Sequence, residues 1–267
     1  MAERALDTLV EEAAEASGDT DELLARLHAA GRRLAESRRD AGAVAGAIGR
    51  VLAAAYRQRH LSADELRLVV SEEARAICDA RRRAAFAIAV QLAPHLADAH
   101  VMTHSASATV REAFQHTPPS HVVCTVSSPR EEGRAFAEEL REAGLEVELV
   151  DDDEAPAALE RAHLLLLGAD TVYRDGTLGN KVGTYPLAKV AHERGVAVAV
   201  ALEVLKLSPH DSADARDLAE DGTRDFTPPA LLGQLVTEEG VFEPGEVAAM
   251  IDRTPFLREG YELLRSD

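Results

Sequence analysis

The chain has 267 residues, of which 46% are hydrophobic, enough for one α/β domain or for a small domain joined to a larger one. Its formal net charge of −18 at pH 7 comes from 47 acidic and 29 basic residues spread over the whole length. Such a surface repels nucleic-acid phosphates, so direct DNA binding is not expected, and the absence of an apolar run of roughly 18 residues argues against a membrane segment.

Composition also bears on the environment of the protein. Scattered acidic residues, only three lysines and abundant alanine are typical of adaptation to high salt, where carboxylates keep the surface hydrated. The alternative is an acidic protein that binds a basic partner. Cys78 and Cys124 lie far apart without metal-ligand spacing, so we expect a reducing, cytoplasmic location and no metal site. No secretory signal is expected at the N-terminus.

The first part of the chain has a helical pattern. From residue 2 to 95, apolar residues recur every three or four positions, as in DELLARLHAAGRRLAES. Asp21 after Thr20 suggests a helix start, and Ser62 followed by Glu65 has the spacing of a capping box. Residues 1–95 are therefore predicted to form a helical domain of about four helices. The triplet Arg81–Arg83 is interpreted as a solvated helix face, with a local RNA-binding patch as the alternative.

The second part, residues 96–267, alternates strands with helices. The predicted strands are HVMTH, HVVCTV, LEVELVD, HLLLLGAD and VAVAVALEV, which indicate a parallel sheet covered on both faces. A helix is expected after Thr227, followed by a helical extension. Ligands bind beyond the carboxyl ends of such strands, which points to four segments. These are His104-Ser105, Ser127-Ser128, Asp170 and Glu203–Lys206.

The segment from Gly168 to Pro209 holds all three lysines, whereas every other basic residue is arginine. Asn180 and Lys181 precede a predicted helix, whose N-terminal N–H groups and positive potential suit a phosphate together with the lysine. Nearby glycines, including Gly183, would allow close backbone approach. The alternative is a glycine-rich turn with a solvated lysine. Lys206 follows the next strand and is a similar candidate, whereas Lys189 is expected on the surface.

Asp170 follows a buried strand, so partial desolvation would raise its pKa toward that of a general acid or base. A turn or N-cap role is the alternative. His104 and Ser105 are adjacent on a strand end and point to opposite faces, so they cannot form a nucleophile–base pair. No G-x-S-x-G, H-E-x-x-H, Walker or G-x-G-x-x-G motif is present. Serine hydrolase, zinc protease and nucleotide-binding classes therefore lack motif support.

These motifs resemble a known family. The segment resembles the signature of the alpha, beta and delta subunits of eukaryotic translation initiation factor 2B and of their relatives, ribose-1,5-bisphosphate isomerase and methylthioribose-1-phosphate isomerase. The matching elements are Gly168-Ala169-Asp170, Gly176, Asn180-Lys181, Gly183-Thr184-Tyr185 and Lys206–Pro209. VMTHSAS, SSPREEGRAFAEEL and DFTPPALLGQLVTEEG extend the resemblance over nearly the whole chain. It implies a helical N-terminal domain, a Rossmann-like α/β domain and a homodimer.

The chain also departs from the family pattern. The isomerases carry a cysteine where Ser105 stands, which works with the aspartate equivalent to Asp170, and an arginine where Ser128 stands. A serine hydroxyl is a far poorer acid than a thiol. The resemblance therefore implies a regulatory, non-catalytic protein similar to initiation factor 2B subunits, with a translation initiation factor partner, a nucleotide or sugar-phosphate ligand and no cofactor.

Two alternatives remain. The first is an aldose–ketose isomerase acting on a phosphorylated ribose, with Asp170 as acid or base and Ser105 in place of the thiol. The second is a metabolite sensor without a role in translation. In each case the resemblance implies the same ligand-binding residues, namely His104, Gly168, Asn180, Lys181, Gly183 and Lys206.

Overall fold

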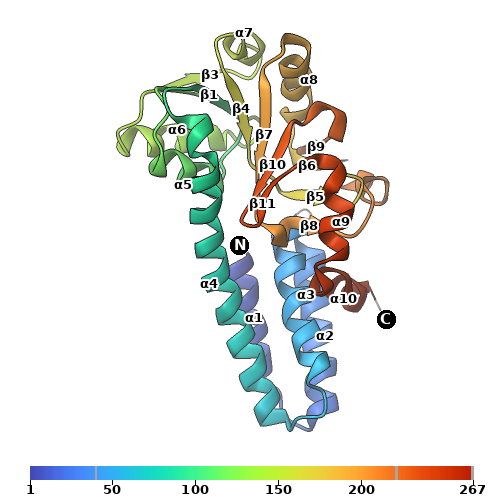
Figure 1. Ribbon diagram of the computed structural model, residues 1–267. Coiled ribbons are helices and arrows are strands. Elements are labelled where there is room, and N and C mark those ends of the chain that lie inside the picture. The colour runs from blue at the N-terminus through green and yellow to red at the C-terminus, as the bar shows by residue number, and fades with distance from the viewer. Residues whose placement is uncertain (40, 220–221, 266–267) are drawn as a thin grey trace.

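The computed structural model describes residues 1–39, 41–219 and 222–265. Its first part is a group of helices that lies below the sheets in Figure 1, with the long helix α4 running up to them. The four helices expected from the sequence are α1 (Ala2–Glu15), α2 (Thr20–Ser37), α3 (Gly42–Arg57) and α4 (Ala63–Leu96). None of the described helices is long and apolar enough to cross a lipid bilayer.

The helix starts agree in part with the sequence. The predicted capping box at α4 is present, because Ser62 accepts from the Glu65 N–H and the Glu65 side chain accepts from Ser62. At α2 the cap is Asp19 rather than Asp21, since the Asp19 carboxylate accepts from the N–H groups of Asp21 and Glu22. Both caps satisfy donors that a helix end leaves unpaired.

The main sheet has the strand order β11-β10-β7-β4-β1-β2-β3. All neighbouring strands are parallel except the edge pair β10–β11, and the five strands expected from the sequence are present. The strands are β1 (His100–Thr103), β2 (His121–Thr125), β3 (Val147–Val150), β4 (Leu164–Leu167), β7 (Ala197–Ala201), β10 (Gln234–Thr237) and β11 (Gly240–Phe242).

Helices cover both faces of this sheet, as predicted. Along β4, Leu164 and Leu166 join a core with α4, α5 (Ala108–His116) and α6 (Glu132–Glu142). Leu165 and Leu167 join the opposite core with α7 (Ala155–Leu159), α8 (Thr184–Arg194) and α9 (Val247–Asp252). A strand buried on both faces explains why β4 is an unbroken run of leucines.

A second sheet was not predicted. Its order is β8-β5-β6-β9, from β5 (Thr171–Tyr173), β6 (Leu178–Lys181), β8 (Leu207–Ser208) and β9 (Arg224–Thr227). These strands are too short to show an alternating pattern in the sequence. Because β6 and β9 are antiparallel neighbours, Lys181 lies opposite Arg224 and Asn180 opposite Asp225.

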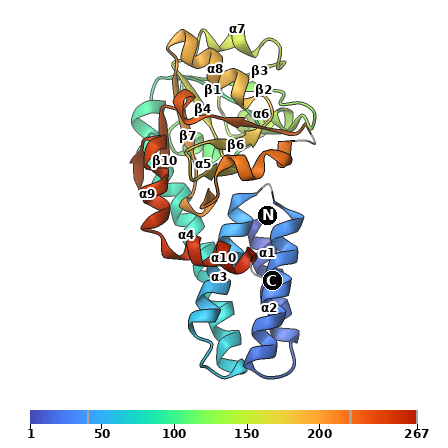
Figure 2. The same cartoon turned by 90° about the vertical axis from the view of Figure 1, so that its right-hand side faces the viewer.

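The end of the chain differs from the prediction. The helix expected after Thr227 is only a 3-10 turn at Pro229–Leu231, followed by β10 and β11. The C-terminal helix α10 (Pro255–Arg265) then returns to the helical part and packs across α3, as Figure 2 shows. The division into domains 1–95 and 96–267 stays a prediction, and α10 makes contacts across it.

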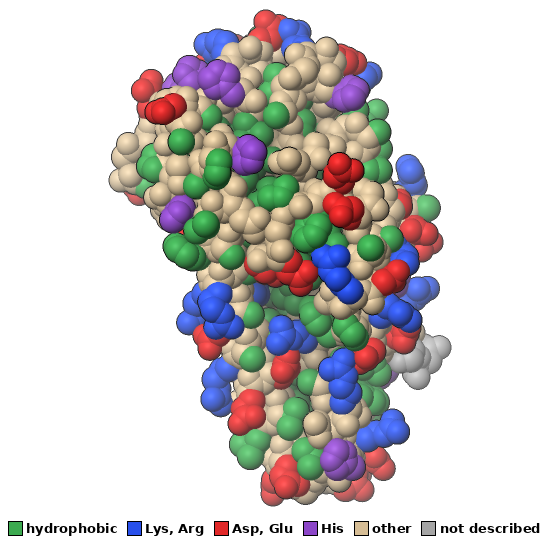
Figure 3. Space-filling model, viewed as in Figure 1, with side chains coloured by type: hydrophobic (Ala, Val, Ile, Leu, Met, Phe, Trp, Pro, Cys, Tyr) green, Lys and Arg blue, Asp and Glu red, His purple; other side chains and the backbone are tan. Residues whose placement is uncertain are grey.

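Acidic and basic side chains are interspersed over the helical part on the face shown in Figure 3. Several form ion pairs between helices, such as Arg26 with Glu12 at 2.8 Å and Arg50 with Glu73 at 2.6 Å. Ion pairs that keep contact with solvent contribute little stability individually, typically about 0–1 kcal/mol. The helical part is held together mainly by its apolar core.

Glycines on α3 allow this helix to approach neighbouring backbones closely. A Cβ at Gly46 would lie 2.2 Å from the carbonyl oxygen of Leu205, and one at Gly49 would lie 2.9 Å from the Gly260 backbone of α10. A Cβ at Gly42 would lie 2.8 Å from the Lys206 carbonyl oxygen. The loop that carries Lys206 is thus fixed against α3 at a distance that other residues would not permit.

We predict that Gly46→Ala lowers the free energy of unfolding by about 1–3 kcal/mol, because the added methyl group must displace α3 or the Leu205 backbone. Gly245→Ala is the matched control, since its Cβ would meet no atom within 4 Å. Chemical denaturation of both variants checks this. Equal stabilities would show that α3 can move away without cost.

Candidate functional site

A cavity of about 420 Å³ lies at the carboxyl ends of the main-sheet strands, where the second sheet and the helical part meet them. Its size suits a small organic ligand. Of the predicted residues, His104, Ser105, Gly168, Asp170, Asn180, Lys181 and Lys206 line it. Gly183 instead packs against the His104 ring: a Cβ there would lie 2.8 Å from that ring, and its φ of +101° also favours glycine.

His104 is a structural residue of the cavity wall. Its ring is buried, with Nε2 donating to the Val182 carbonyl at 2.8 Å and Nδ1 accepting from Thr125 Oγ1 at 2.7 Å. Burial lowers the pKa of His104, which agrees with the neutral tautomer that these bonds require. His104 therefore links β1, β2 and the end of β6 and presents little surface to a ligand.

Ser105 belongs to a chain of hydrogen bonds on one wall. Its Oγ donates to Glu132 Oε1 at 2.8 Å, and Lys181 Nζ donates to Glu132 Oε2 at 3.0 Å. The Lys181 side chain is only 6% exposed. Burial opposes ionisation of Glu132, but the bonds from Lys181 and Ser105 hold its pKa below the usual range. The sequence did not single out Glu132.

Asp170 also lines the cavity, beside basic groups. Its carboxylate forms an ion pair with Arg224 at 3.1 Å, and the Arg224 side chain is buried. Lys206 Nζ donates to the Ala169 carbonyl at 2.8 Å. Burial lowers the pKa of Lys206, while Glu203 and Asp170 act in the opposite direction. The wall therefore combines a carboxylate with an ammonium group that loses its proton more readily than an ordinary lysine.

The interpretation of Arg81–Arg83 as a solvated face is wrong for Arg81. This side chain extends from α4 into the cavity, where two of its nitrogens donate to Glu203 at 2.6 and 3.1 Å. Arg82 is exposed and pairs with Asp79 on its own helix. One residue of the triplet faces inward because a helix turns by about 100° per residue.

The expected phosphate site at a helix N-terminus is also corrected. The N–H groups of Gly183 and Tyr185 at the start of α8 donate to Asp225 Oδ2 at 2.8 and 3.0 Å. A carboxylate from β9 thus already occupies the position that an anion would take. Lys181 itself lies in β6 and lines the cavity, and its role in phosphate binding stays a prediction.

The cavity is positively charged although the chain is acidic. Six cationic side chains line its described part against three carboxylates. The cations are Arg38, Arg81, Arg130, Lys181, Lys206 and Arg224, and the carboxylates are Glu132, Asp170 and Glu203. Clefts of one sign attract ligands of the other sign. Arg130, which also lines the cavity, lies two positions after Ser128, the position where the family pattern has an arginine.

The sequence analysis missed Arg38 and Arg224, which lie away from the strand ends of the main sheet. It also missed Arg130 and Glu132, although they follow the strand-end segment Ser127-Ser128 by a few positions. The sequence feature that could have identified Glu132 is its position in SSPREEGR, directly before the glycine of that motif. A Cβ at this glycine, Gly133, would lie 1.8 Å from the Thr125 carbonyl oxygen, so α6 begins close against β2. Within the described residues, no group of three His, Cys, Asp or Glu side chains is arranged to hold a metal ion.

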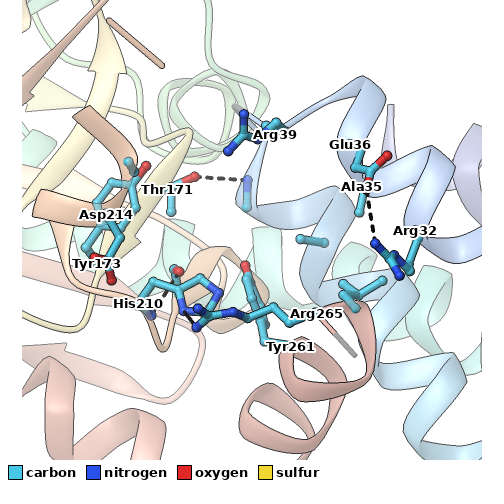
Figure 4. Close-up of a pocket in the computed structure, with 15 residues that line it drawn as sticks. Arg32, Ala35, Glu36, Arg39, Thr171, Tyr173, His210, Asp214, Tyr261 and Arg265 are labelled. Carbon is cyan, nitrogen blue, oxygen red and sulfur yellow. Dashed lines mark hydrogen bonds and ion pairs between the residues drawn. The ribbon is translucent and has the colours of Figure 1, made fainter. Parts of the chain in front are cut away.

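A second cavity, of about 410 Å³, lies between α2, α3, β5 and α10 (Figure 4). Its guanidinium groups already have neighbours: Arg32 lies 3.8 Å from Glu36, Arg39 lies 3.4 Å from Asp217, and Arg265 lies 3.4 Å from His210. It contains neither lysine of the predicted site. We therefore assign the candidate functional site to the first cavity.

The chain belongs to the initiation factor 2 subunit family, whose model matches residues 1–225. It is 31% identical to ribose 1,5-bisphosphate isomerase of Haloferax volcanii over 280 aligned positions, covering 94% of this chain and 84% of that protein. It is 35% identical to a putative translation initiation factor eIF-2B subunit 2-like protein of Pyrococcus abyssi over 159 positions, which cover 54% of this chain and 58% of that protein.

Solved structures support the fold. The translation initiation factor eIF-2B of Pyrococcus horikoshii superimposes with a TM-score of 0.76 at 25% identity, covering 91% of this chain and 90% of that one. The 5-methylthioribose 1-phosphate isomerase of the same organism gives 0.71 at 20% identity, covering 100% of this chain and 83% of that one. The predicted class, helices followed by a Rossmann-like α/β region, is confirmed.

The expectation of a regulatory, non-catalytic protein is corrected by these comparisons. The relative from Haloferax volcanii aligns along most of both chains and is named an isomerase. A second isomerase, the methylthioribose-1-phosphate isomerase of Chloroflexus aurantiacus, is 30% identical over 189 positions, which cover 57% of this chain and 54% of that one. The expectation had depended on two departures from the family pattern, Ser105 in place of a cysteine and Ser128 in place of an arginine. Glu132, which bonds to Ser105, had not been considered.

We predict a pH dependence of stability from Asp225. Burial raises its pKa to about 6, above the unfolded value of about 3.9, so the folded state holds this proton more tightly. The stability that the protonated Asp225 carboxyl contributes is therefore fully present below about pH 4 and is lost as the pH rises through 6. Asp225→Asn should become more stable relative to the wild type by roughly 1–3 kcal/mol between pH 4 and 7. Denaturant unfolding of both proteins across this pH range measures the difference in their free energies of unfolding. A difference that does not change with pH would contradict the prediction.

Proposed function

We propose that the protein is an aldose–ketose isomerase that acts on a pentose phosphorylated at carbon 1. The observation that carries the proposal is one cavity lined by Asp170 and Lys206 together with the hydrogen-bonded residues Ser105, Glu132 and Lys181. The names of the isomerase relatives supply the substrate class. Excess positive charge in the cavity favours a phosphorylated ligand over a neutral sugar.

The chemistry of such a substrate sets what the site must do. A sugar phosphorylated on its anomeric carbon has no free aldehyde, so the ring must open before carbon 2 can become a ketone. The bond from carbon 1 to the ring oxygen breaks and the ring oxygen takes up a proton. Hydrogen then moves with its electron pair from carbon 2 to carbon 1, while the carbon-2 hydroxyl gives up its proton. One general acid and one general base suffice.

Asp170 is assigned as the general base. Its carboxylate lies in the cavity, is about 38% exposed and is held by Arg224 at 3.1 Å, so its position is fixed before substrate binds. It accepts the proton of the carbon-2 hydroxyl. The proton for the ring oxygen comes from the wall that carries Ser105.

Of the remaining predicted residues, the two lysines bind the substrate and the others shape the cavity. Lys181 and Lys206 are the ammonium groups that can reach phosphate oxygens, with Arg130 and Arg38 lining the same cavity. Asn180 donates to Thr184 Oγ1 at 3.1 Å and shapes the turn after β6. Gly168 lets Ser107 approach, because a Cβ there would lie 2.6 Å from Ser107 Oγ. We also propose a homodimer in a high-salt cytoplasm.

We predict that Asp170→Asn lowers kcat for conversion of ribose 1,5-bisphosphate to its ketose by at least about 10²-fold, because the amide cannot accept the hydroxyl proton. The assay is run in high salt, with ketose formation followed in time. The control is Asp151→Asn, whose carboxylate is 67% exposed and lies outside the cavity. If Asp170→Asn keeps wild-type turnover, the assignment is wrong; if the wild type itself is inactive on 1-phosphorylated pentoses, the function is wrong.

A further inference from the structure

We propose that Glu132 supplies the acid proton of this site through the Ser105 hydroxyl, replacing the thiol of the related isomerases, and that phosphate binding at Lys181 brings Glu132 into its protonated form. The inference rests on the proposed isomerase function and deepens it. It addresses the chemical difficulty that a serine hydroxyl alone is too weak an acid at neutral pH.

The geometry places these groups in a continuous line. Ser105 Oγ lies 2.8 Å from Glu132 Oε1, and Glu132 Oε2 lies 3.0 Å from Lys181 Nζ. All three residues line the cavity. They come from three elements: the turn after β1, the start of α6, and β6. A carboxyl group with one oxygen on a hydroxyl and the other on an ammonium can exchange a proton with the hydroxyl while the ammonium sets its affinity for that proton.

The backbone around Ser105 fixes its direction. Ser105 has φ of +66°, a left-handed conformation that is uncommon for residues other than glycine. Its N–H donates to the buried Ser127 Oγ at 2.8 Å. Ser127 also has a positive φ, of +65°, and its N–H donates to Asp152 at 2.8 Å. The two turns fix the main chain at Ser105, and the hydrogen bond to Glu132 Oε1 orients its hydroxyl.

The charges facing Glu132 explain a change on ligand binding. In the unliganded protein, Lys181 from β6 and Ser105 from the β1 turn stabilise the carboxylate, and burial lowers the pKa of the nearby His104 imidazole. Arg130, from the same turn as Glu132, lines the cavity as well. A phosphate dianion that binds Lys181 competes for this ammonium and adds negative charge beside the carboxylate. Both effects raise the affinity of Glu132 for a proton.

The proposed step balances as follows. Protonated Glu132 donates to Ser105 Oγ as the Ser105 proton passes to the ring oxygen, and the bond between carbon 1 and that oxygen breaks. The hydrogen on carbon 2 moves with its electron pair to carbon 1. The carbon-2 hydroxyl proton goes to Asp170, and carbon 2 becomes the carbonyl. Glu132 ends as the carboxylate and Asp170 ends protonated. Exchange with solvent after product release restores both.

The test uses Glu132→Gln, Ser105→Cys and the double variant S105C/E132Q, assayed with ribose 1,5-bisphosphate from pH 5 to 10. Glu132→Gln should lower kcat by roughly 10²–10⁴-fold, since an amide cannot donate this proton. The double variant should recover to within about tenfold of the wild type, because a thiol supplies its own proton. Its activity should fall only near the thiol pKa of about 8.5, whereas that of the wild type falls at lower pH.

Glu131→Gln is the matched control. Its side chain is 53% exposed, pairs with Arg134 at 2.8 Å and does not line the cavity, so activity should stay unchanged. Recovery in the double variant also shows that an amide at position 132 permits folding. Equal turnover by wild type and Glu132→Gln, or no recovery by S105C/E132Q while Ser105→Cys is active, would overturn the inference alone. An inactive wild type at every pH would overturn the proposed function and the inference with it.

Discussion

The close contact between α3 and the loop at Leu205–Lys206 is the constraint on which the site depends. Because Gly42 and Gly46 lack side chains, the start of α3 rests on the backbone carbonyls of Lys206 and Leu205. The Gly42 N–H also donates to the Asp170 carbonyl at 3.1 Å. One short helical segment thus fixes both the segment that carries Asp170, the proposed general base, and the segment that carries Lys206. The helical part is therefore a structural component of the cavity rather than an appendage.

Much of the fold followed from the sequence, and the reasons for the exceptions are physical. Strands such as β4, buried on both faces, need continuous apolar residues and can be recognised from them. The second sheet is stabilised by pairing between strands of two to four residues, whose sequences carry no periodicity. The local pattern after Thr227 favours a helix, although Gln234–Thr237 pairs beside β7 as a strand. These strands form because they pair with segments that are distant in the sequence, and a local sequence pattern carries no information on such pairing.

The same distinction applies to the site. Residues at strand ends, such as Asp170, could be predicted because parallel strands deliver their carboxyl ends to one edge. Arg81 could not, because it reaches the cavity from a distant helix to meet Glu203. Glu132 could not either, since its meaning comes from contact with Ser105 and Lys181 in space. The expectation of a non-catalytic protein judged Ser105 and Ser128 by their own side chains and left out Glu132, which bonds to Ser105.

The ion pair between Glu132 and Lys181 suggests how a site can replace a thiol acid by a hydroxyl and a carboxyl group. A thiol needs no neighbour to be an acid near neutral pH, whereas a hydroxyl needs a carboxyl group behind it. In the empty cavity the ion pair with Lys181 holds the pKa of this carboxyl group, Glu132, below its usual range, so the group stays charged. The same lysine is a natural contact for the substrate phosphate. Substrate binding and proton uptake are then linked through one ammonium group, so the acid is formed only in the complex where it is used.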